Sequence, residues 1–345
     1  MKEILRYLPE GWEAAAWEQG AMQRRRGVIE TPASLLRLNM LYVTNGGSFA
    51  MAALGMALCE GIQMSKVAAF ERIGKSGTWL RWMAKTLMEK DGMALEKPAF
   101  LGERNVTLHD ASDEASKGSK KSEHRLHFGF DLFNFHAKGV ELTSIKEGER
   151  LTRHSIAPGE IVVADRIYCT VTGIEHVLAG GAEFVLRFKS KAFHLYDEEG
   201  KRVELLPKLR HLEALEHTDL HVFYQHEGKL RSLRIVAMKK DAKAIEESKR
   251  KMARKVSKKQ EKAVQADTAE LNEYIVLATN MTDTNAQILE LYRARWQVEQ
   301  VFYRLKSLFG YGDTPNRRED TTKAWFYGKL LLAALCESIL KRQCH

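Results

Sequence analysis

Four side chains that could act on a phosphate lie close together near the C-terminal end of the sequence. Tyr292, Arg295, Glu299 and Lys306 follow one another at spacings of three, four and seven residues. At about 100° per residue, these spacings place all four within an arc of about 60° on one helix. A carboxylate flanked by two cations and a phenol could bind a metal ion and hold an anionic substrate. An ordinary row of surface salt bridges has the same pattern, so this face alone does not establish a function.

The segment from Asp283 to about Gly310 is predicted to form the single long helix that carries this face. An adjoining arc should face the core, because it is apolar: Leu291, Val298, Phe302, Leu305 and Phe309. The opposite side is polar and should be solvated: Arg293, Gln297, Gln300 and Arg304. Trp296 borders the functional face and could stack on a displaced base. A half-buried helix aromatic is the commoner interpretation of such a residue.

The first 95 or so residues are predicted to be helical. Thr31 followed by Pro32 is typical of an N-cap with proline at the first helical position. Three apolar-periodic stretches follow, at 32–43, 48–61 and 65–90, with glycine breaks between the first two and after the second. Short helices of this kind could form a helix-turn-helix DNA-binding module. A small helical bundle fits equally well, because no recognition-helix residues stand out.

From about residue 103 the pattern changes to short β-rich segments. The run EIVVADRIY, residues 160–168, is typical of a buried strand with an acid, Asp165, at its C-terminal end. An aspartate in that place is often only a turn or cap residue. Further strands are predicted at 183–190, 219–228, 230–240 and 272–280, and Glu227, Gly228 and Lys229 indicate a hairpin.

Positive charge is concentrated in one segment. Lys and Arg exceed Asp and Glu by 9 in the whole chain, and the 24 residues from Lys239 to Lys262 contain 11 basic and 4 acidic ones. This segment has no Gly or Pro, so we expect a helix. A surplus of one sign indicates contact with a nucleic-acid backbone, although a solvated charged helix has the same pattern. The candidate DNA contacts are Lys249, Arg250, Arg254, Lys255, Lys258 and Lys259.

The remaining composition argues against several classes of protein. The four cysteines are Cys59, Cys169, Cys336 and Cys344. They lie far apart and form no CxxC pair, which argues against a zinc site or a disulfide framework and fits a reducing compartment. The N-terminus has no apolar core of signal-peptide type. The longest uncharged apolar run, Leu330 to Cys336, is too short to span a bilayer. We therefore expect a cytoplasmic protein with no membrane contact.

The string YRARWQVEQVFYRLK, residues 292–306, fits the spacing Y-x2-R-x3-E-x6-K. It resembles the YREK signature of the DDE transposases of bacterial insertion sequences, in the IS-four-like group. VTLHDAS followed by HRLHFGFDL resembles the region of the family's first aspartate, and IVVADRIY resembles that of the second. The resemblance therefore implies Asp110, Asp165 and Glu299 as the catalytic acids. Asp113 and Glu114 lie close enough to be alternatives for the first acid.

The resemblance also implies an α/β fold, namely a ribonuclease-H-like mixed sheet core with an N-terminal helical region and an inserted β-rich subdomain. About 134 residues separate Asp165 from Glu299, too many for one connection in a compact sheet. We expect residues 1–100 to be a helical DNA-binding region and 101–180 to be the first part of the core. Residues 181–268 would be the insertion with the basic helix, and 269–345 the rest of the core with a C-terminal helix.

The implied chemistry is metal-dependent hydrolysis and strand transfer on DNA. Two Mg²⁺ (or Mn²⁺) ions would activate a water and then a 3′-hydroxyl, and would stabilise the leaving oxygen. Their ligands would be the three acids, Asp110, Asp165 and Glu299. The terminal phosphate beside the cleavage site would be held by Tyr292, Arg295 and Lys306.

The expected function is that of a transposase that binds the terminal inverted repeats of its insertion sequence and moves it by cut and paste. Two alternatives are a metal-dependent nuclease of the same fold that cuts without transposing, and a domesticated DNA-binding protein. The presence of all three acids and of the four signature residues argues against the domesticated protein. The expected partners are double-stranded DNA, both transposon ends and target, and a second copy of the chain on that DNA. The expected location is the bacterial cytoplasm, at the nucleoid.

Overall fold

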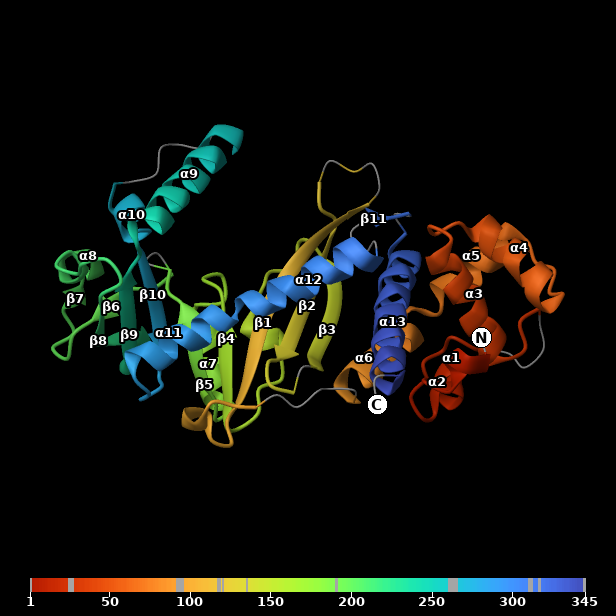
Figure 1. The fold of residues 1–345 in the computed structure, drawn as a ribbon, viewed down its shortest axis with the longest axis horizontal. Coiled ribbons are helices and arrows are strands. Elements are labelled where there is room, and N and C mark those ends of the chain that lie inside the picture. The colour runs from red at the N-terminus through yellow and green to blue at the C-terminus, as the bar shows by residue number, and fades with distance from the viewer. Residues whose placement is uncertain are drawn as a thin grey trace. The chain divides into compact units, whose positions relative to one another are not determined.

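The computed structural model describes residues 2–343 except positions 24–27, 91–95, 117–118, 120, 135, 190–191, 260–265, 310–312 and 316–317. The chain forms two compact units (Figure 1). Unit 1 comprises Met1–Leu95, Ala111–Gly148 and Val298–His345, and unit 2 comprises Glu96–Asp110 and Glu149–Gln297. The division falls within strand β1 (Asn105–Ser116) and at the start of helix α12 (Trp296–Phe309).

Unit 1 begins with helices whose ends follow from local sequence: α1 (Lys2–Leu5), α2 (Trp12–Glu18), α3 (Pro32–Thr44), α4 (Phe49–Glu60), α5 (Lys66–Gly74) and α6 (Gly77–Lys90). The predicted N-cap is confirmed, because the Thr31 hydroxyl accepts a hydrogen bond from the Ser34 amide at 3.1 Å. Gly61 ends α4 in the left-handed conformation that glycine adopts without steric cost. The stretch 65–90, predicted as one helical segment, divides into α5 and α6.

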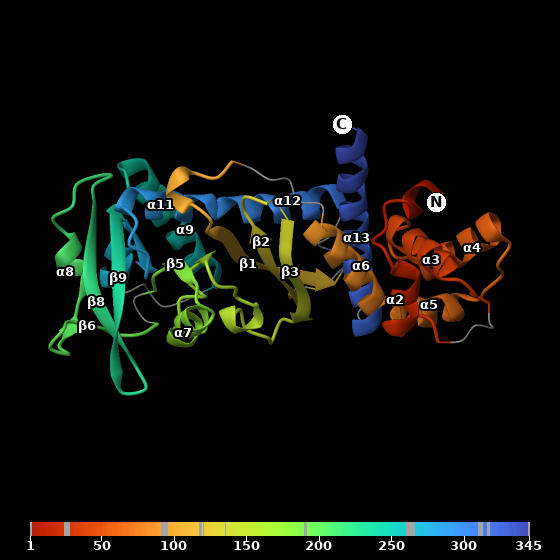
Figure 2. The same ribbon diagram turned by 90° about the horizontal axis from the view of Figure 1, so that it is seen from below.

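The C-terminal helix α13 (Glu319–Gln343) completes the core of unit 1. It lies along α6 and also contacts α3 and α5 (Figure 2). Tyr42 of α3 is fully buried, with its ring 4.7 Å from that of Phe49 and 5.6 Å from that of Trp325 on α13. Segments from both ends of the sequence therefore share one apolar core. Neither α13 nor any other helix in the described part of the chain is long and apolar enough to cross a membrane.

A small set of strands belongs to unit 1 as well. β2 (His124–Asp131) pairs antiparallel with β3 (His136–Ser144), the later half of β1 lies beside β2, and β11 (Asp313–Thr314) runs parallel to β1. The Leu142 amide on β3 donates to the Tyr327 hydroxyl of α13 at 3.0 Å. This bond fastens the strands to the helical core of the same unit.

Unit 2 is built on a mixed sheet, which confirms the α/β class expected from the sequence. Its strands lie in the order β1, β4 (Glu160–Ala164), β5 (Glu183–Arg187), β10 (Tyr274–Thr279), β9 (Lys229–Lys239), β8 (His217–His226), β6 (Leu195–Tyr196) and β7 (Arg202–Val203). β1, β4 and β5 are parallel, and the later pairs are antiparallel. β4 is buried throughout, as the apolar run after Glu160 predicts.

Helices cover both faces of this sheet. α7 (Val171–Ala179) and α8 (Leu205–Leu209) contribute to the large apolar cluster on one face, and α11 (Asn285–Ala294) packs on β4, β5, β8 and β9 from the other (Figure 2). Strand alternation divides the side chains between these layers. Short 3₁₀ turns at Ala99–Leu101 and Leu151–Arg153 precede β1 and β4.

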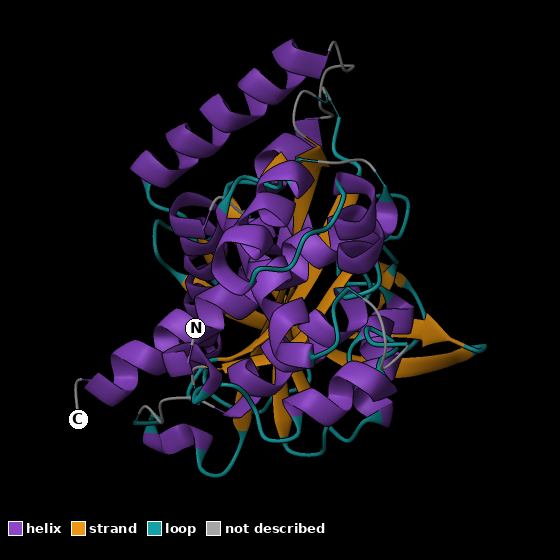
Figure 3. Cartoon of the chain, turned by 90° about the vertical axis from the view of Figure 1, so that its right-hand side faces the viewer, coloured by secondary structure: helices purple, strands orange, loops and turns teal. Residues whose placement is uncertain are grey.

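The segment expected as an insertion begins within the central sheet. β5 lies in this range and is hydrogen-bonded in parallel to β4. The predicted hairpin is confirmed as β8 and β9, with Glu227 and Gly228 both at positive φ in the turn. The basic segment forms α9 (Ala242–Lys259), which stands away from the strands of unit 2 and is followed by α10 (Ala266–Leu271) (Figures 1 and 3).

Candidate active site

Two of the predicted acids lie side by side in unit 2. β1 and β4 are parallel neighbours, and the last residues of their shared register, His109 and Ala164, directly precede Asp110 and Asp165. Carboxyl ends of parallel strands meet at one edge of a sheet, which is where open α/β sheets bind ligands. The Asp110 side chain is 18% exposed, and Asp165 is also partly buried.

Tyr292 and Arg295 of the predicted helix face contact these two acids, which directly follow the paired part of β1 and β4. The Tyr292 hydroxyl donates to Asp165 Oδ1 at 3.3 Å, and Arg295 Nη1 donates to Asp110 Oδ2 at 3.2 Å. Burial, and next the negative charge of Asp165, raise the pKa of Tyr292, so its hydroxyl keeps its proton and acts as a donor. The structure thus brings together four of the residues singled out from the sequence, although they lie up to 185 positions apart.

The expectation of a single long helix is wrong. α11 ends at Ala294 and α12 begins at Trp296, with Arg295 between them. The Arg295 amide bonds to the carbonyl of Tyr292, three residues back instead of four. Its φ of −51° and ψ of −30° remain helical, so the break is a tightened turn and not a loop. A helical wheel of constant pitch therefore does not apply to all four residues: Tyr292 lies on α11, Arg295 at the junction, and Glu299 and Lys306 on α12.

The buried face of these helices was predicted well where it is described. Leu291 is 3%, Val298 0% and Phe302 7% exposed, and the Phe302 ring lies 5.6 Å from that of Phe128 in unit 1. The side chains of Leu305 and Phe309 lie outside the described residues. An apolar stripe of this kind is what fixes the rotation of a helix against its core.

The other signature residues lie at the start of α12 and beyond. Glu299 is exposed and stands in the first helical turn, where a negative charge interacts favourably with the helix dipole. Trp296 is 56% exposed, so it does not have the half-buried position that such aromatics usually take. The Lys306 side chain lies outside the described residues.

Sequence reasoning missed Arg187, the last residue of β5. Its Nη2 donates to the Tyr274 carbonyl at 2.9 Å, and its guanidinium carbon lies 5.9 Å from the centre of the Tyr292 ring. Burial lowers the pKa of Arg187, and the positive charges of Arg166 and Arg295 lower it further. The sequence did contain a signal that could have identified Arg187, namely a charged residue at the end of the apolar strand EFVLR. Asp165 has the comparable position directly after its own strand.

A basic cavity lies beside this arginine. Its volume is about 180 Å³, and Arg166, Arg187 and Lys189 contribute to its lining. Lys240 is close enough to be affected, because burial, Arg187 and Arg166 lower its pKa to about 8. Of these cations, Arg187 and Lys240 are partly buried, and Arg166 and Lys189 are exposed. A group of neighbouring positive charges is an arrangement that an anion would stabilise.

The alternative first acids lie in unit 1. Asp113 Oδ1 is 2.7 Å from Arg125 Nε, and Glu114 is almost fully buried and accepts from the Ser112 hydroxyl at 2.8 Å. Both therefore have structural partners on or beside β1. Within the described ranges, no three His, Cys, Asp or Glu side chains converge closely enough to hold a metal ion.

The basic helix α9 has an exposed cationic surface. Arg250 and Arg254 are exposed, whereas Lys249 pairs with Glu273 at 2.8 Å. The remaining candidate side chains on this helix lie outside the described residues: Lys255, Lys258 and Lys259.

Comparison with known proteins decides the family. The family described as "Transposase DDE domain" matches residues 102–335. The chain belongs to the DDE transposase family. It is similar to the putative transposase InsL for insertion sequence element IS186A of Escherichia coli, at 26% identity over 343 residues that cover 96% of this chain and 91% of the relative. The transposase for IS421 of Escherichia coli gives the same identity over 344 residues, again covering 96% and 91%.

A third relative matches over a shorter region. The transposase for IS231F of Bacillus thuringiensis subsp. israelensis is 25% identical over 240 residues, which cover 63% of this chain and 49% of that protein. The membership in the DDE transposase family and the ribonuclease-H-like fold expected from the sequence are thus confirmed. DDE transposases are DNA-cleaving and strand-transferring enzymes that generally use divalent metal ions.

Proposed function

We propose that the chain is the transposase of an insertion sequence, which binds the element's terminal inverted repeats and moves the element by cutting and strand transfer. The observation that supports this most is that two acids on neighbouring parallel strands, just past the paired residues of β1 and β4, contact two residues of the signature segment. Asp110 and Asp165 there contact Arg295 and Tyr292, respectively. The family membership and the names of the relatives, which are transposases of insertion sequences, support the same function.

The donor chemistry of the acids fits a divalent cation. Asp110 and Asp165 offer carboxylate oxygens from rigid neighbouring strands, and hard oxygen donors are what Mg²⁺ and Mn²⁺ prefer. Glu299 would supply the third carboxylate. Two bound ions would lower the pKa of the attacking water or 3′-hydroxyl and stabilise the leaving oxygen.

The cations around the acids would hold the DNA end. The Arg295 guanidinium has five donors, so it can contact a carboxylate and a phosphate oxygen together. Arg187, 5.9 Å from the Tyr292 ring, adds a partly buried positive charge on the same side. Tyr292 keeps its proton, so its hydroxyl would donate to the phosphate in place of Asp165 once Asp165 binds a metal ion. Lys306 would reach the phosphate as a point charge. Together these residues would orient the scissile phosphate against the acids.

More distant surfaces would bind the rest of the DNA. Trp296 is exposed enough to stack on a displaced base. Arg250 and Arg254 of α9 would contact the backbone, and the N-terminal helices would contribute to end recognition. Two ends must be brought together for transposition, so we propose that the DNA-bound form is a homodimer.

The test uses a duplex that carries the element's inverted repeat and its flanking sequence. With Mg²⁺, the wild-type chain should cut at the repeat and join the freed 3′-end to target DNA. Asp165→Asn and Glu299→Gln should bind the duplex with nearly unchanged affinity and leave it uncut. Glu290→Gln is the matched control, because Glu290 is an exposed acid of α11 outside the proposed site.

Two outcomes would contradict the proposal. Cutting by Glu299→Gln at the wild-type rate would remove Glu299 from the active site. Cutting of the repeat without any joined product would favour a nuclease of the same fold over a transposase.

A further inference from the structure

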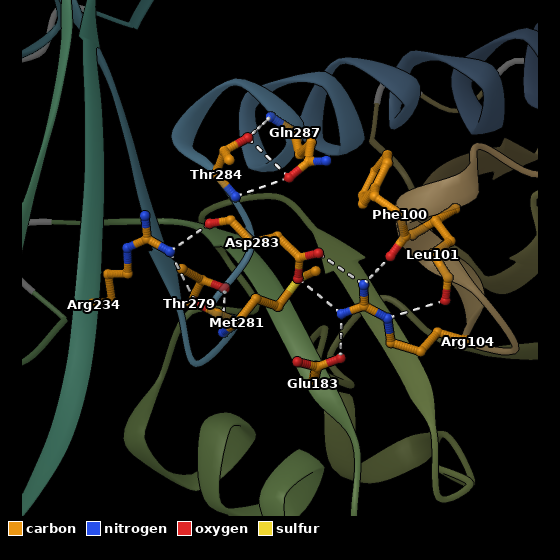
Figure 4. A network of polar contacts seen from close by, with 10 residues as sticks. All are labelled: Phe100, Leu101, Arg104, Glu183, Arg234, Thr279, Met281, Asp283, Thr284 and Gln287. Carbon is orange, nitrogen blue, oxygen red and sulfur yellow. Dashed lines mark hydrogen bonds and ion pairs between the residues drawn. The ribbon is translucent and has the colours of Figure 1, made fainter.

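Arg104, which directly precedes β1, uses its whole guanidinium group in hydrogen bonds. Nη1 and Nη2 each donate to one carboxylate oxygen of Asp283 at 2.8 Å, and Nη1 also donates to Glu183 Oε2 at 2.9 Å. Nη2 and Nε donate to the carbonyls of Phe100 and Leu101 at 2.5 and 3.1 Å (Figure 4). A guanidinium group has five N–H donors, and five hydrogen bonds hold this one. The side chain is therefore fixed in place.

Arg234 on β9 contacts the segment that joins β10 to α11, to which Asp283 also belongs. Its Nη1 donates to the backbone carbonyls of Met281 and Asp283 at 3.1 and 2.7 Å (Figure 4). Its Nη2 donates to the side-chain oxygen of Asn285 at 2.6 Å. Asp219 accepts both from Arg234 Nε at 3.0 Å and from the Asn285 amide at 3.1 Å. Two arginines thus hold the segment that joins β10 to α11.

Local bonds add a third restraint at the start of α11. Thr284 and Gln287 form a capping box, in which the Thr284 amide donates to Gln287 Oε1 at 2.9 Å. The Thr279 hydroxyl donates to the Phe184 carbonyl at 2.6 Å and accepts from the Met281 amide at 3.1 Å. The first turn of α11 is therefore fixed before the helix runs towards the site.

Because α11 is held at its start, a small change of orientation there would produce a larger displacement at its far end. Arg104 directly precedes β1 and Glu183 begins β5, whereas Asp110 lies where β1 leaves its pairing with β4 and Arg187 ends β5. α11 begins at the connection and has 10 residues, so it is about 15 Å long. A tilt of about 4° at its base would move its far end by about 1 Å. A displacement of about 1 Å at a reacting group can lower a rate about 100-fold.

We propose that Arg104 and Arg234 are positioning residues that fix the orientation of α11. They thereby determine the position of Tyr292 relative to Asp165 and that of Arg295 relative to Asp110. They act through the helix and touch neither DNA nor metal. The proposal rests on the function proposed above, because it concerns the same site.

The first measurement does not depend on activity. The full chain is labelled with 3-fluorotyrosine, and the ¹⁹F resonance of Tyr292 is assigned by its loss in Tyr292→Phe. Arg104→Met should shift this resonance. Arg104→Lys keeps a charge for Asp283, so it should fold and give a smaller shift. The matched control is Arg210→Met, which breaks the bidentate pair with Glu270 (2.8 and 3.0 Å) in the same unit and leaves α11 untouched.

The second measurement is the rate of cleavage at saturating end DNA. Arg104→Met should cut about 10- to 100-fold more slowly, as expected for a displacement of up to about 1 Å. The Kd should stay within about threefold, because backbone contacts elsewhere dominate affinity. Arg104→Lys should be intermediate, and Arg210→Met should equal wild type. Arg234→Met should behave as Arg104→Met does.

The two proposals fail in different ways. If wild type does not cleave but the Tyr292 signal moves in Arg104→Met, the proposed function fails and the positioning role stands. If wild type cleaves, and folded Arg104→Met or Arg104→Lys keeps both the signal and the rate of wild type, the positioning role is overturned alone.

Discussion

Replacing Arg104 by methionine should lower the free energy of unfolding by about 2–3 kcal/mol, which lies between the costs of breaking exposed and buried ion pairs. The side chains of Arg104 and Asp283 are 25% and 11% exposed. Removing one partner of a fully buried pair costs about 3–5 kcal/mol, and an exposed pair contributes about 1 kcal/mol or less. Asp283 would lose both of its donors at a position close to full burial, whereas water reaches part of Arg104. The expected value is therefore nearer to the lower end of the buried range.

The assay is denaturant unfolding of wild type, Arg104→Met, Asp283→Asn and the double variant. The coupling energy from this cycle should be about 0.5–3 kcal/mol, the range for residues in direct contact. Arg210→Met breaks a pair whose side chains are 55% and 35% exposed, so it should lower the stability much less than Arg104→Met does.

The same pair makes a prediction about pH. The hydrogen bonds from Arg104 lower the pKa of Asp283, so the unfolded chain takes up its proton at a higher pH than the folded chain does. The stabilisation is complete above the unfolded value of about 3.9 and is lost as the pH falls through the lower folded value. Below pH of about 4, wild type should therefore lose more stability than Arg104→Met. Equal stability of Arg104→Met and Arg210→Met, with no coupling to Asp283, would refute this reasoning.

Three further predictions concern other parts of the chain. Phe302→Ala should lower the free energy of unfolding by about 3–5 kcal/mol, because the side chain is buried. Tyr303→Ala, at a position 67% exposed, should lower it by about 0.5 kcal/mol or less. Equal midpoints of the two variants in urea unfolding would contradict the assigned helix faces. The pKa of Lys240 is lowered to about 8, so above that pH the unfolded chain binds more protons than the folded chain. The stability of wild type should therefore rise as the pH increases from about 8 to about 10. Thermal melts across that range should show this rise in wild type and not in Lys240→Met. Arg250→Gln and Arg254→Gln should each reduce the slope of log affinity against log salt by about one, and unchanged slopes would mean that α9 does not touch DNA.

Much of the candidate site could be predicted because its signals are local. A charged residue closing an apolar strand identified Asp165, and the fixed spacing on one helical stretch identified Tyr292 and Arg295. Parallel pairing of β1 and β4 then placed Asp110 and Asp165 at the same edge, as an α/β fold requires.

Other features depend on contacts that no spacing reveals. Arg104 and Asp283 are 179 positions apart, and nothing in either local sequence distinguishes this pair from ordinary surface charges. The tightened turn at Arg295 was missed because its residues have normal helix propensity, so only packing on either side could produce it. Arg187 was missed because strand ends often carry charge, and its neighbours Tyr274 and Tyr292 come from distant segments.

The central claim is that Asp110 and Asp165 bind the catalytic metal ions directly. The most direct test replaces Asp165 by cysteine and measures cleavage of end DNA in Mg²⁺ and in Mn²⁺. A thiolate is a poor ligand for Mg²⁺ and a better one for softer ions. Asp165→Cys should therefore be inactive with Mg²⁺ and regain measurable cleavage with Mn²⁺, while Asp165→Ala stays inactive with both. Wild-type cleavage by Asp165→Cys in Mg²⁺, or no difference between Asp165→Cys and Asp165→Ala in Mn²⁺, would contradict the account.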